Sequence, residues 1–137
     1  MYAVGMFKMF LTTAVTCLVG CSNLSKSDDE TISRSLTAAD AERSITVAPT
    51  GSFDIELQSN PTAGYEWSLS VEPPEIVATI SKQYTADASG RVGVGGVTRW
   101  SLSARMVGSA TLIFMYSRPW EKGVSPTRIV TFQIDVR

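Results

Sequence analysis

Alternation of apolar and polar residues dominates the chain from Ser44 onward. Apolar side chains take every second position in residues 53–58, 65–71 and 99–104, with charged, hydroxyl or amide side chains between them. A period of two predicts strands that bury one face and leave the other in water. No part of this region shows the period of an amphipathic helix.

Four further segments complete the predicted set of strands. Residues 110–116 are apolar on both faces, which favours a strand in the middle of a sheet. Residues 129–136 have one apolar face, residues 45–47 make a short first strand, and residues 76–84 a weaker one. About seven to eight strands separated by turns predict an all-β, immunoglobulin-like sandwich of antiparallel strands. We assign residues 44–137 to this single domain.

The N-terminus has the pattern of a targeting segment. Lys8 is the only charged residue before Cys21, and residues 9–19 are apolar apart from three threonines and Cys17. Such a run is short for a membrane span and is typical of a signal peptide, here residues 1–20. Its end, Leu18-Val19-Gly20-Cys21, resembles a bacterial lipobox.

The lipobox resemblance implies cleavage before Cys21 and lipidation of its thiol. Attachment to the bacterial envelope would follow, and Ser22 favours the outer membrane where the host has two membranes. The alternative is an ordinary secretory signal that leaves Cys21 as a free thiol. Residues 21–43 are rich in Ser, Thr and Asp with few aliphatic side chains, which predicts a flexible tether.

Composition excludes several classes of function. The chain has no histidine, which removes Ser-His-Asp and Cys-His catalytic arrangements and the commonest zinc ligand. Asp54 and Glu56 share the solvated face of one strand, and we interpret them as solubilising charges. Loss of Lys8 with the signal leaves 11 basic residues against 13 acidic ones, which argues against nucleic-acid binding. A monomeric binding module with no enzyme activity, metal or cofactor is the prediction that remains.

Two loops in the predicted domain carry Pro or Gly in unusual density. In the run Asn60-Pro61-Thr62-Ala63-Gly64-Tyr65, Pro61 restricts its own φ and Gly64 can take a positive φ. Such a loop is stiff before it binds anything, although an ordinary turn has the same composition. In Gly93-Val94-Gly95-Gly96, Gly95 and Gly96 would let the backbone approach another chain, unless the segment is only a flexible hairpin connection.

A third loop carries an aromatic side chain. Arg118-Pro119-Trp120 follows a strongly apolar strand, so we expect Trp120 in a loop, where an exposed tryptophan is typical of an interface anchor. The alternative is that Trp120 folds back onto the domain. Trp67 and Trp100 lie on alternating strands, and we expect both in the core.

These three motifs, in this order and with these separations, resemble the inhibitory loops of the chagasin family of cysteine-protease inhibitors. The loops of that family read roughly NPTTG(F/Y)xW, GxGG and RP(F/W), and the resemblance covers residues 44–137. It implies that the loops line up at one end of the sandwich and reversibly occupy the active-site cleft of a papain-like cysteine protease. The residues that would contact the protease are Asn60, Pro61, Thr62, Ala63, Gly64, Tyr65, Gly93, Val94, Gly95, Gly96, Arg118, Pro119 and Trp120.

The resemblance also assigns a place to each loop. Thr62 and its neighbours would lie at the catalytic thiol, residues 93–96 along the unprimed side of the cleft, and Trp120 on the primed side. Ala63 stands where the family has a second threonine, so a hydrogen bond of about 1 kcal/mol to some targets would be missing. A structural or adhesive immunoglobulin-like module of the envelope is the alternative function.

Overall fold

The computed structural model describes residues 34–91 and 93–137. The signal peptide, Cys21 and residues 21–33 of the predicted tether lie outside them. The described part of the chain contains eight strands and two short 3-10 turns, η1 and η2. Their bounds are β1 (Leu36–Thr37), η1 (Ala38–Asp40), β2 (Ser44–Val47), β3 (Ser52–Ser59), η2 (Pro61–Ala63), β4 (Glu66–Glu72), β5 (Val77–Ala86), β6 (Gly96–Ala104), β7 (Gly108–Ser117) and β8 (Arg128–Val136).

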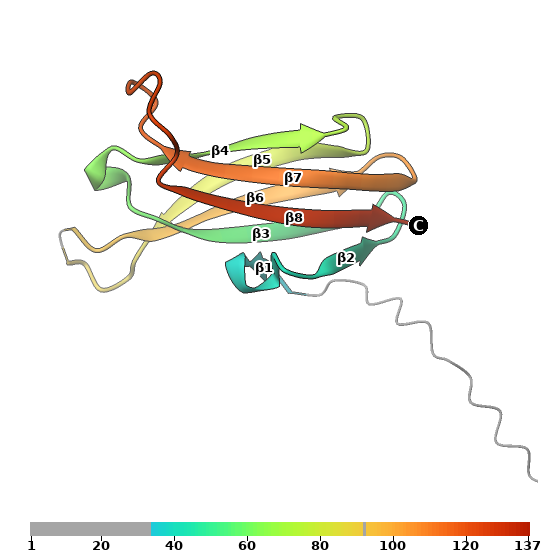
Figure 1. The fold of residues 1–137 in the computed structure, drawn as a ribbon. Helices are drawn as coiled ribbons and strands as arrows, with labels where there is room; N and C mark the ends of the chain where they lie inside the picture. The colour runs from blue at the N-terminus through green and yellow to red at the C-terminus, as the bar shows by residue number, and fades with distance from the viewer. Residues whose placement is uncertain (1–33, 92) are drawn as a thin grey trace, which may run out of the picture.

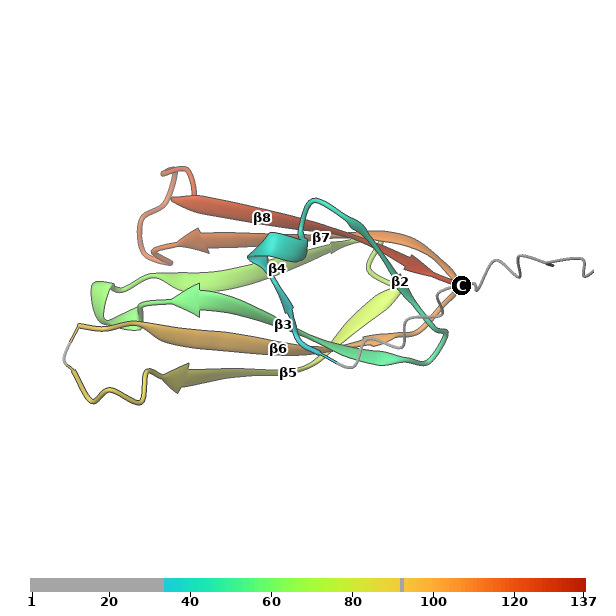
Figure 2. The same ribbon diagram turned by 90° about the horizontal axis from the view of Figure 1, so that it is seen from below.

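The strands form two sheets of four that pack face to face, as Figures 1 and 2 show. One sheet has the order β1-β3-β6-β5, and the other has the order β2-β8-β7-β4. The predicted all-β sandwich is therefore confirmed, and β7 lies inside its sheet as its two apolar faces predict. No helix among residues 34–91 and 93–137 is long and apolar enough to cross a membrane.

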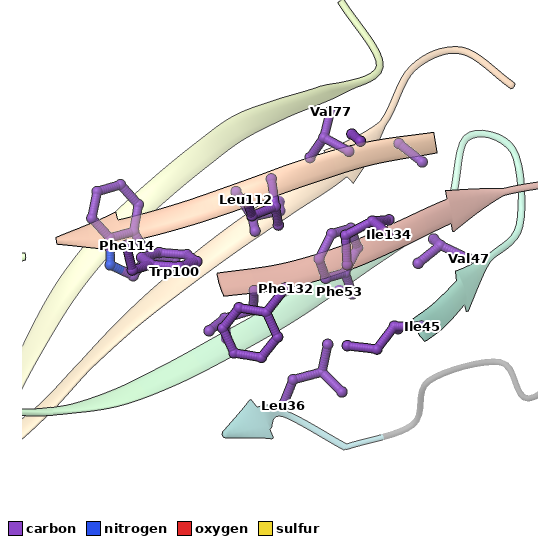
Figure 3. Packing of buried hydrophobic residues seen from close by; sticks show 14 of the residues in the cluster. Leu36, Ile45, Val47, Phe53, Val77, Trp100, Leu112, Phe114, Phe132 and Ile134 are labelled. Carbon is purple, nitrogen blue, oxygen red and sulfur yellow. The ribbon is translucent and has the colours of Figure 1, made fainter. Parts of the chain in front are cut away.

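The core lies between the two sheets and is built from the alternating apolar positions of the predicted strands (Figure 3). Leu102 and Phe114, from opposite sheets, have no exposed surface. Phe114 packs edge-on against Trp100 of the facing sheet and against Phe132 of its own, with ring centroids 5.6 and 5.8 Å apart. Trp67 and Trp100 are 2% and 7% exposed, so their predicted place in the core is confirmed.

Strand direction differs from the prediction at two edges. β1 pairs parallel with β3, and β2 pairs parallel with β8, whereas the other pairings are antiparallel. η1 carries the chain from the edge of one sheet to the edge of the other, as Figure 2 shows. A period of two reports which face of a strand is buried but not its direction, so the pattern could not reveal these parallel pairs.

The predicted tether is wrong for residues 34–43, which belong to the fold. Leu36 is 5% exposed in the core and lies beside Ile55 in the parallel pair. The carboxylate of Asp40 is buried, accepts a hydrogen bond of 2.9 Å from the backbone N–H of Thr37, and forms ion pairs with Arg34 and Arg43. The buried side chain of Leu36 and the fully paired carboxylate of Asp40 order this segment, although its average composition is that of a linker.

The Asp40 contacts predict a pH-dependent contribution to stability. Hydrogen bonds from Arg34 and Thr37 hold the pKa of Asp40 well below its ordinary value of 3.8. Because the folded pKa is lowered, the contribution is complete above pH 3.8 and is lost as the pH falls toward the folded pKa. At pH 7, Asp40→Asn should lower the free energy of unfolding in urea by about 2 kcal/mol.

The difference between Asp40→Asn and the unmodified chain should shrink steadily below pH 3.8. Asp54→Asn is the matched control, because Asp54 lies half-buried on the outer face of β3. It should change the free energy of unfolding by less than about 0.5 kcal/mol. A cost at Asp40 that stays the same from pH 7 to pH 2 would contradict this account of the segment.

Candidate functional site

Three loops lie together at one end of the sandwich, opposite the C-terminus (Figure 1). The first loop (residues 60–65) joins β3 to β4, the second loop (residues 87–95) joins β5 to β6, and the third loop (residues 118–127) joins β7 to β8. We call this the loop end of the molecule. All three motifs singled out in the sequence lie there, with Gly96 at the first position of β6.

The first loop is a tight 3-10 turn. The N–H of Ala63 donates to the carbonyl of Asn60 at 3.3 Å, and that of Gly64 donates to the carbonyl of Pro61 at 2.9 Å. Gly64 has φ +79°, as its position in the motif predicts, and ends the turn. The hydroxyl of Thr62 donates to the side-chain oxygen of Asn60. Residues 61–63 are exposed, so the loop presents a short, internally bonded tip to solvent.

The start of the first loop is bonded to the opposite sheet. The backbone N–H of Asn60 donates to the hydroxyl of Tyr116 at 2.7 Å. Tyr116 lies on β7 and is 8% exposed, with its ring 5.2 Å from that of Tyr65 and 4.7 Å from that of Trp67. The sequence analysis identified Tyr116 only as the end of a buried strand. The hydroxyl that Tyr116 carries at an apolar position of its strand was the only sequence signal of this contact.

Arg118 joins the third loop to the first. Its Nε donates to the carbonyl of Ala63 at 3.2 Å, and its guanidinium carbon lies 4.6 Å from the centre of the Tyr65 ring. Its Nη1 pairs with Glu121 at 3.0 Å, and this carboxylate raises the pKa of Arg118. The guanidinium is therefore engaged within the chain, between the two loops.

Trp120 lies in a loop, as predicted, and is 64% exposed. One edge of its indole covers Gly64, since a Cβ built on Gly64 would lie 2.2 Å from Cη2 of Trp120. Gly64 is thus required twice, once for its positive φ and once for this approach. The remaining surface of the indole faces solvent beside the first loop.

The second loop is joined to the first through Asn60, whose Nδ2 donates to the carbonyl of Gly93 at 3.3 Å. A Cβ at Gly95 would lie 2.5 Å from the carbonyl of Ser59, and one at Gly96 would lie 2.1 Å from that of Thr85. The missing side chains of these two glycines are therefore required within the fold itself, and the approach of a protease to their backbone stays a prediction.

The exposed part of the second loop includes Gly93 and Val94. A Cβ at Gly93 would have no neighbour within 4 Å, and Val94 is 42% exposed. Across the loop end, most exposed side chains are apolar or small, among them Pro61, Thr62, Ala63, Val94, Pro119 and Trp120, and the exposed charged ones are Asp87, Arg91 and Lys122. Within residues 34–91 and 93–137, no group of three or more His, Cys, Asp or Glu side chains could hold a metal ion. The arrangement is suited to contact with a protein surface.

Comparison with known proteins identifies the family. The model of the chagasin family of peptidase inhibitors, I42, matches residues 46–136. This chain belongs to the chagasin family. The family consists of peptidase inhibitors and not of enzymes, which agrees with the exclusion of catalysis from the composition.

Curated relatives and solved structures agree with the family model. The chagasin-family chain is 38% identical to amoebiasin-2 of Entamoeba histolytica over 87 residues, which cover 61% of this chain and 68% of that one. It is 29% identical to chagasin of Trypanosoma cruzi over 93 residues, 65% and 84% of the two chains. A cysteine protease inhibitor of Entamoeba histolytica has a similar fold, with a TM-score of 0.66 and 26% identity over 74% of this chain and 92% of that one.

Gly64 provides a test of the contact between the first and third loops. Gly64→Ala and Gly123→Ala place a side chain at nearly the same positive φ, +79° and +80°, but only the Cβ at position 64 meets Trp120. Each should lose about 1 kcal/mol of unfolding free energy from the φ alone. Gly64→Ala should lose more in urea unfolding, because the indole must move.

The excess cost of Gly64→Ala should vanish when the substitution is made together with Trp120→Ala, which removes the clashing ring. An equal cost of Gly64→Ala with and without the Trp120 ring would mean that the indole does not rest on the first loop in solution.

Proposed function

We propose that this chagasin-family chain is a reversible, non-covalent, tight-binding inhibitor of papain-like cysteine proteases, with the three loops together filling the active-site cleft. The observation that carries the proposal is the direct bonding of the three motifs into one surface. Asn60 contacts the second loop, while Arg118 and Trp120 contact the first. Loops that served only as separate connections between strands would not require these contacts.

The conformation of the first loop supports inhibition over cleavage. A protease binds the segment that it cuts as an extended strand, with the backbone groups free to pair with the enzyme. Residues 61–63 form a 3-10 turn in which backbone groups are bonded within the loop. The tip of the turn enters the cleft at the catalytic thiol, led by Thr62, without presenting an extended scissile bond. Ala63, whose carbonyl accepts from Arg118, follows it.

The energetics of the loop end support tight binding. Loops that are already ordered lose little conformational entropy on association. In a flexible loop, each side chain that binding immobilises costs about 0.5–1.5 kcal/mol. Trp120 offers a large apolar surface with one edge of its ring against Gly64, and exposed tryptophans of this kind are frequent binding hot spots. Arg118 is paired with Glu121 and so brings no uncompensated charge into the cleft.

We propose further that the inhibitor acts as a monomer tied to the bacterial envelope, at the outer membrane where the host has two membranes, through lipid on Cys21. The support is the run Leu18-Val19-Gly20-Cys21, which lies outside the described residues. Cys21→Ala should move the full-length protein from the membrane fraction to the soluble fraction of the producing cells. Membrane association that survives this substitution would contradict the lipid anchor. Light scattering of the domain should give the mass of one chain, which checks the proposed monomer.

Trp120→Ala tests the inhibitory surface. Residues 34–137 of the unmodified chain should inhibit papain, and Trp120→Ala should weaken the inhibition by about 2 kcal/mol, roughly thirtyfold in the inhibition constant. Val107→Ala is the control, because Val107 is 69% exposed between β6 and β7 at the end of the sandwich opposite the loops. It should leave the inhibition constant unchanged. Absence of inhibition at micromolar concentration would refute the proposed function.

A further inference from the structure

We infer that Tyr116 is a positioning residue for inhibition, whose hydroxyl holds the first loop in the turn that meets the protease. The inference rests on the proposed function and deepens it, because Tyr116 lies outside the three motifs. Its ring is buried and contacts Tyr65 and Trp67, so it acts through the first loop and not by touching the protease.

The need for this hydroxyl arises where β3 ends. The ladder between β3 and β6 closes with the pair Ser59 and Gly96, and Asn60 then leaves the strand with φ −132° and ψ 85°. Its backbone N–H lies beyond the last pair of the ladder. Without another partner, this partly buried N–H would destabilise the backbone conformation of Asn60. The hydroxyl of Tyr116 accepts this N–H at 2.7 Å. The bond therefore favours the backbone geometry at which the turn begins.

The position of the hydroxyl is set by the core. The phenol oxygen lies in the plane of its ring, and the ring is held between Tyr65 and Trp67 at centroid distances of 5.2 and 4.7 Å. Trp67 is itself fixed, because its Nε1 donates to the carbonyl of Gln58 at 3.0 Å. A hydroxyl on a packed aromatic ring has little freedom to follow the loop, so the loop must follow the hydroxyl.

Tyr116 and Arg118 hold the first loop at its start and at the last residue of its 3-10 turn. Tyr116 lies near the end of β7 and Arg118 directly follows this strand, and their polar groups reach the same loop, with Tyr116 bonded to Asn60 and Arg118 bonded to Ala63. β7 also leads directly into the third loop. One strand thus sets the position of two of the three loops relative to each other, which is the geometry that simultaneous entry into a cleft requires.

The test is Tyr116→Phe, which removes the hydroxyl and keeps the ring. The inhibition constant for papain should rise by about five- to tenfold, the value expected for the loss of one hydrogen bond that orders the loop. In the free protein, NMR order parameters of the amides of residues 62–64 should fall. Ser109→Ala removes a hydroxyl that donates to Asp135 at 3.1 Å near the opposite end of the sandwich, and it should change neither quantity.

A second control separates positioning from general destabilisation. Ile134→Val deletes one methylene from a fully buried side chain of β8 near the opposite end of the sandwich, and should lower stability by an amount similar to Tyr116→Phe. Because the domain stays folded at 25 °C, Ile134→Val should leave inhibition and loop order unchanged. An increase in the inhibition constant that is equal for the two variants, or absent for Tyr116→Phe, would overturn the inference.

The free-protein measurement keeps the two claims apart. If the unmodified domain does not inhibit papain, the proposed function fails, while a loss of order in residues 62–64 of Tyr116→Phe still supports the positioning of the first loop. If the domain inhibits papain and the order parameters of Tyr116→Phe match those of the unmodified domain, the positioning role fails and the proposed function stands.

Discussion

The packing of Trp67, Tyr116 and Tyr65 joins the core of the sandwich to its loops. In the middle of the molecule the two sheets are held by aliphatic side chains and by Phe53, Trp100, Phe114 and Phe132, which bury surface but make no side-chain bond to a loop. At the loop end these three rings also bury surface, and two of them carry polar atoms that bond to the backbone. Trp67 bonds to Gln58, and Tyr116 bonds to Asn60. The buried rings thereby fix the position of the exposed first loop.

The three loops depend on one another as a consequence. Asn60 bonds to the second loop, Arg118 bonds to the carbonyl of Ala63, and the indole of Trp120 covers Gly64. The entropy of ordering the loops is therefore lost on folding and not on binding, which favours a high affinity for a rigid cleft. The same dependence predicts non-additive effects, since a change in one loop alters the position of its neighbour.

The sequence was most informative where local chemistry decides the outcome. A period of two found the strands, and the flanking residues separated exposed Trp120 from the buried tryptophans. Contacts between distant residues were out of reach of that reasoning. Leu36 and Asp40 are ordered by partners that a linker-like composition does not reveal. Gly95 has no side chain because the carbonyl of Ser59 at the end of β3 occupies that space. The hydroxyl of Tyr116 accepts a hydrogen bond from Asn60, a residue 56 positions away.

The central claim is that the first loop covers the catalytic thiol of a papain-like protease without being cut. Alkylation of the papain active-site cysteine by iodoacetamide tests it directly, because only an accessible thiolate reacts. One equivalent of residues 34–137 should block alkylation, and the chain recovered after denaturation should have its full mass. Alkylation at the rate of free papain in an inhibited complex, or recovery of a chain cleaved within residues 60–65, would contradict the account.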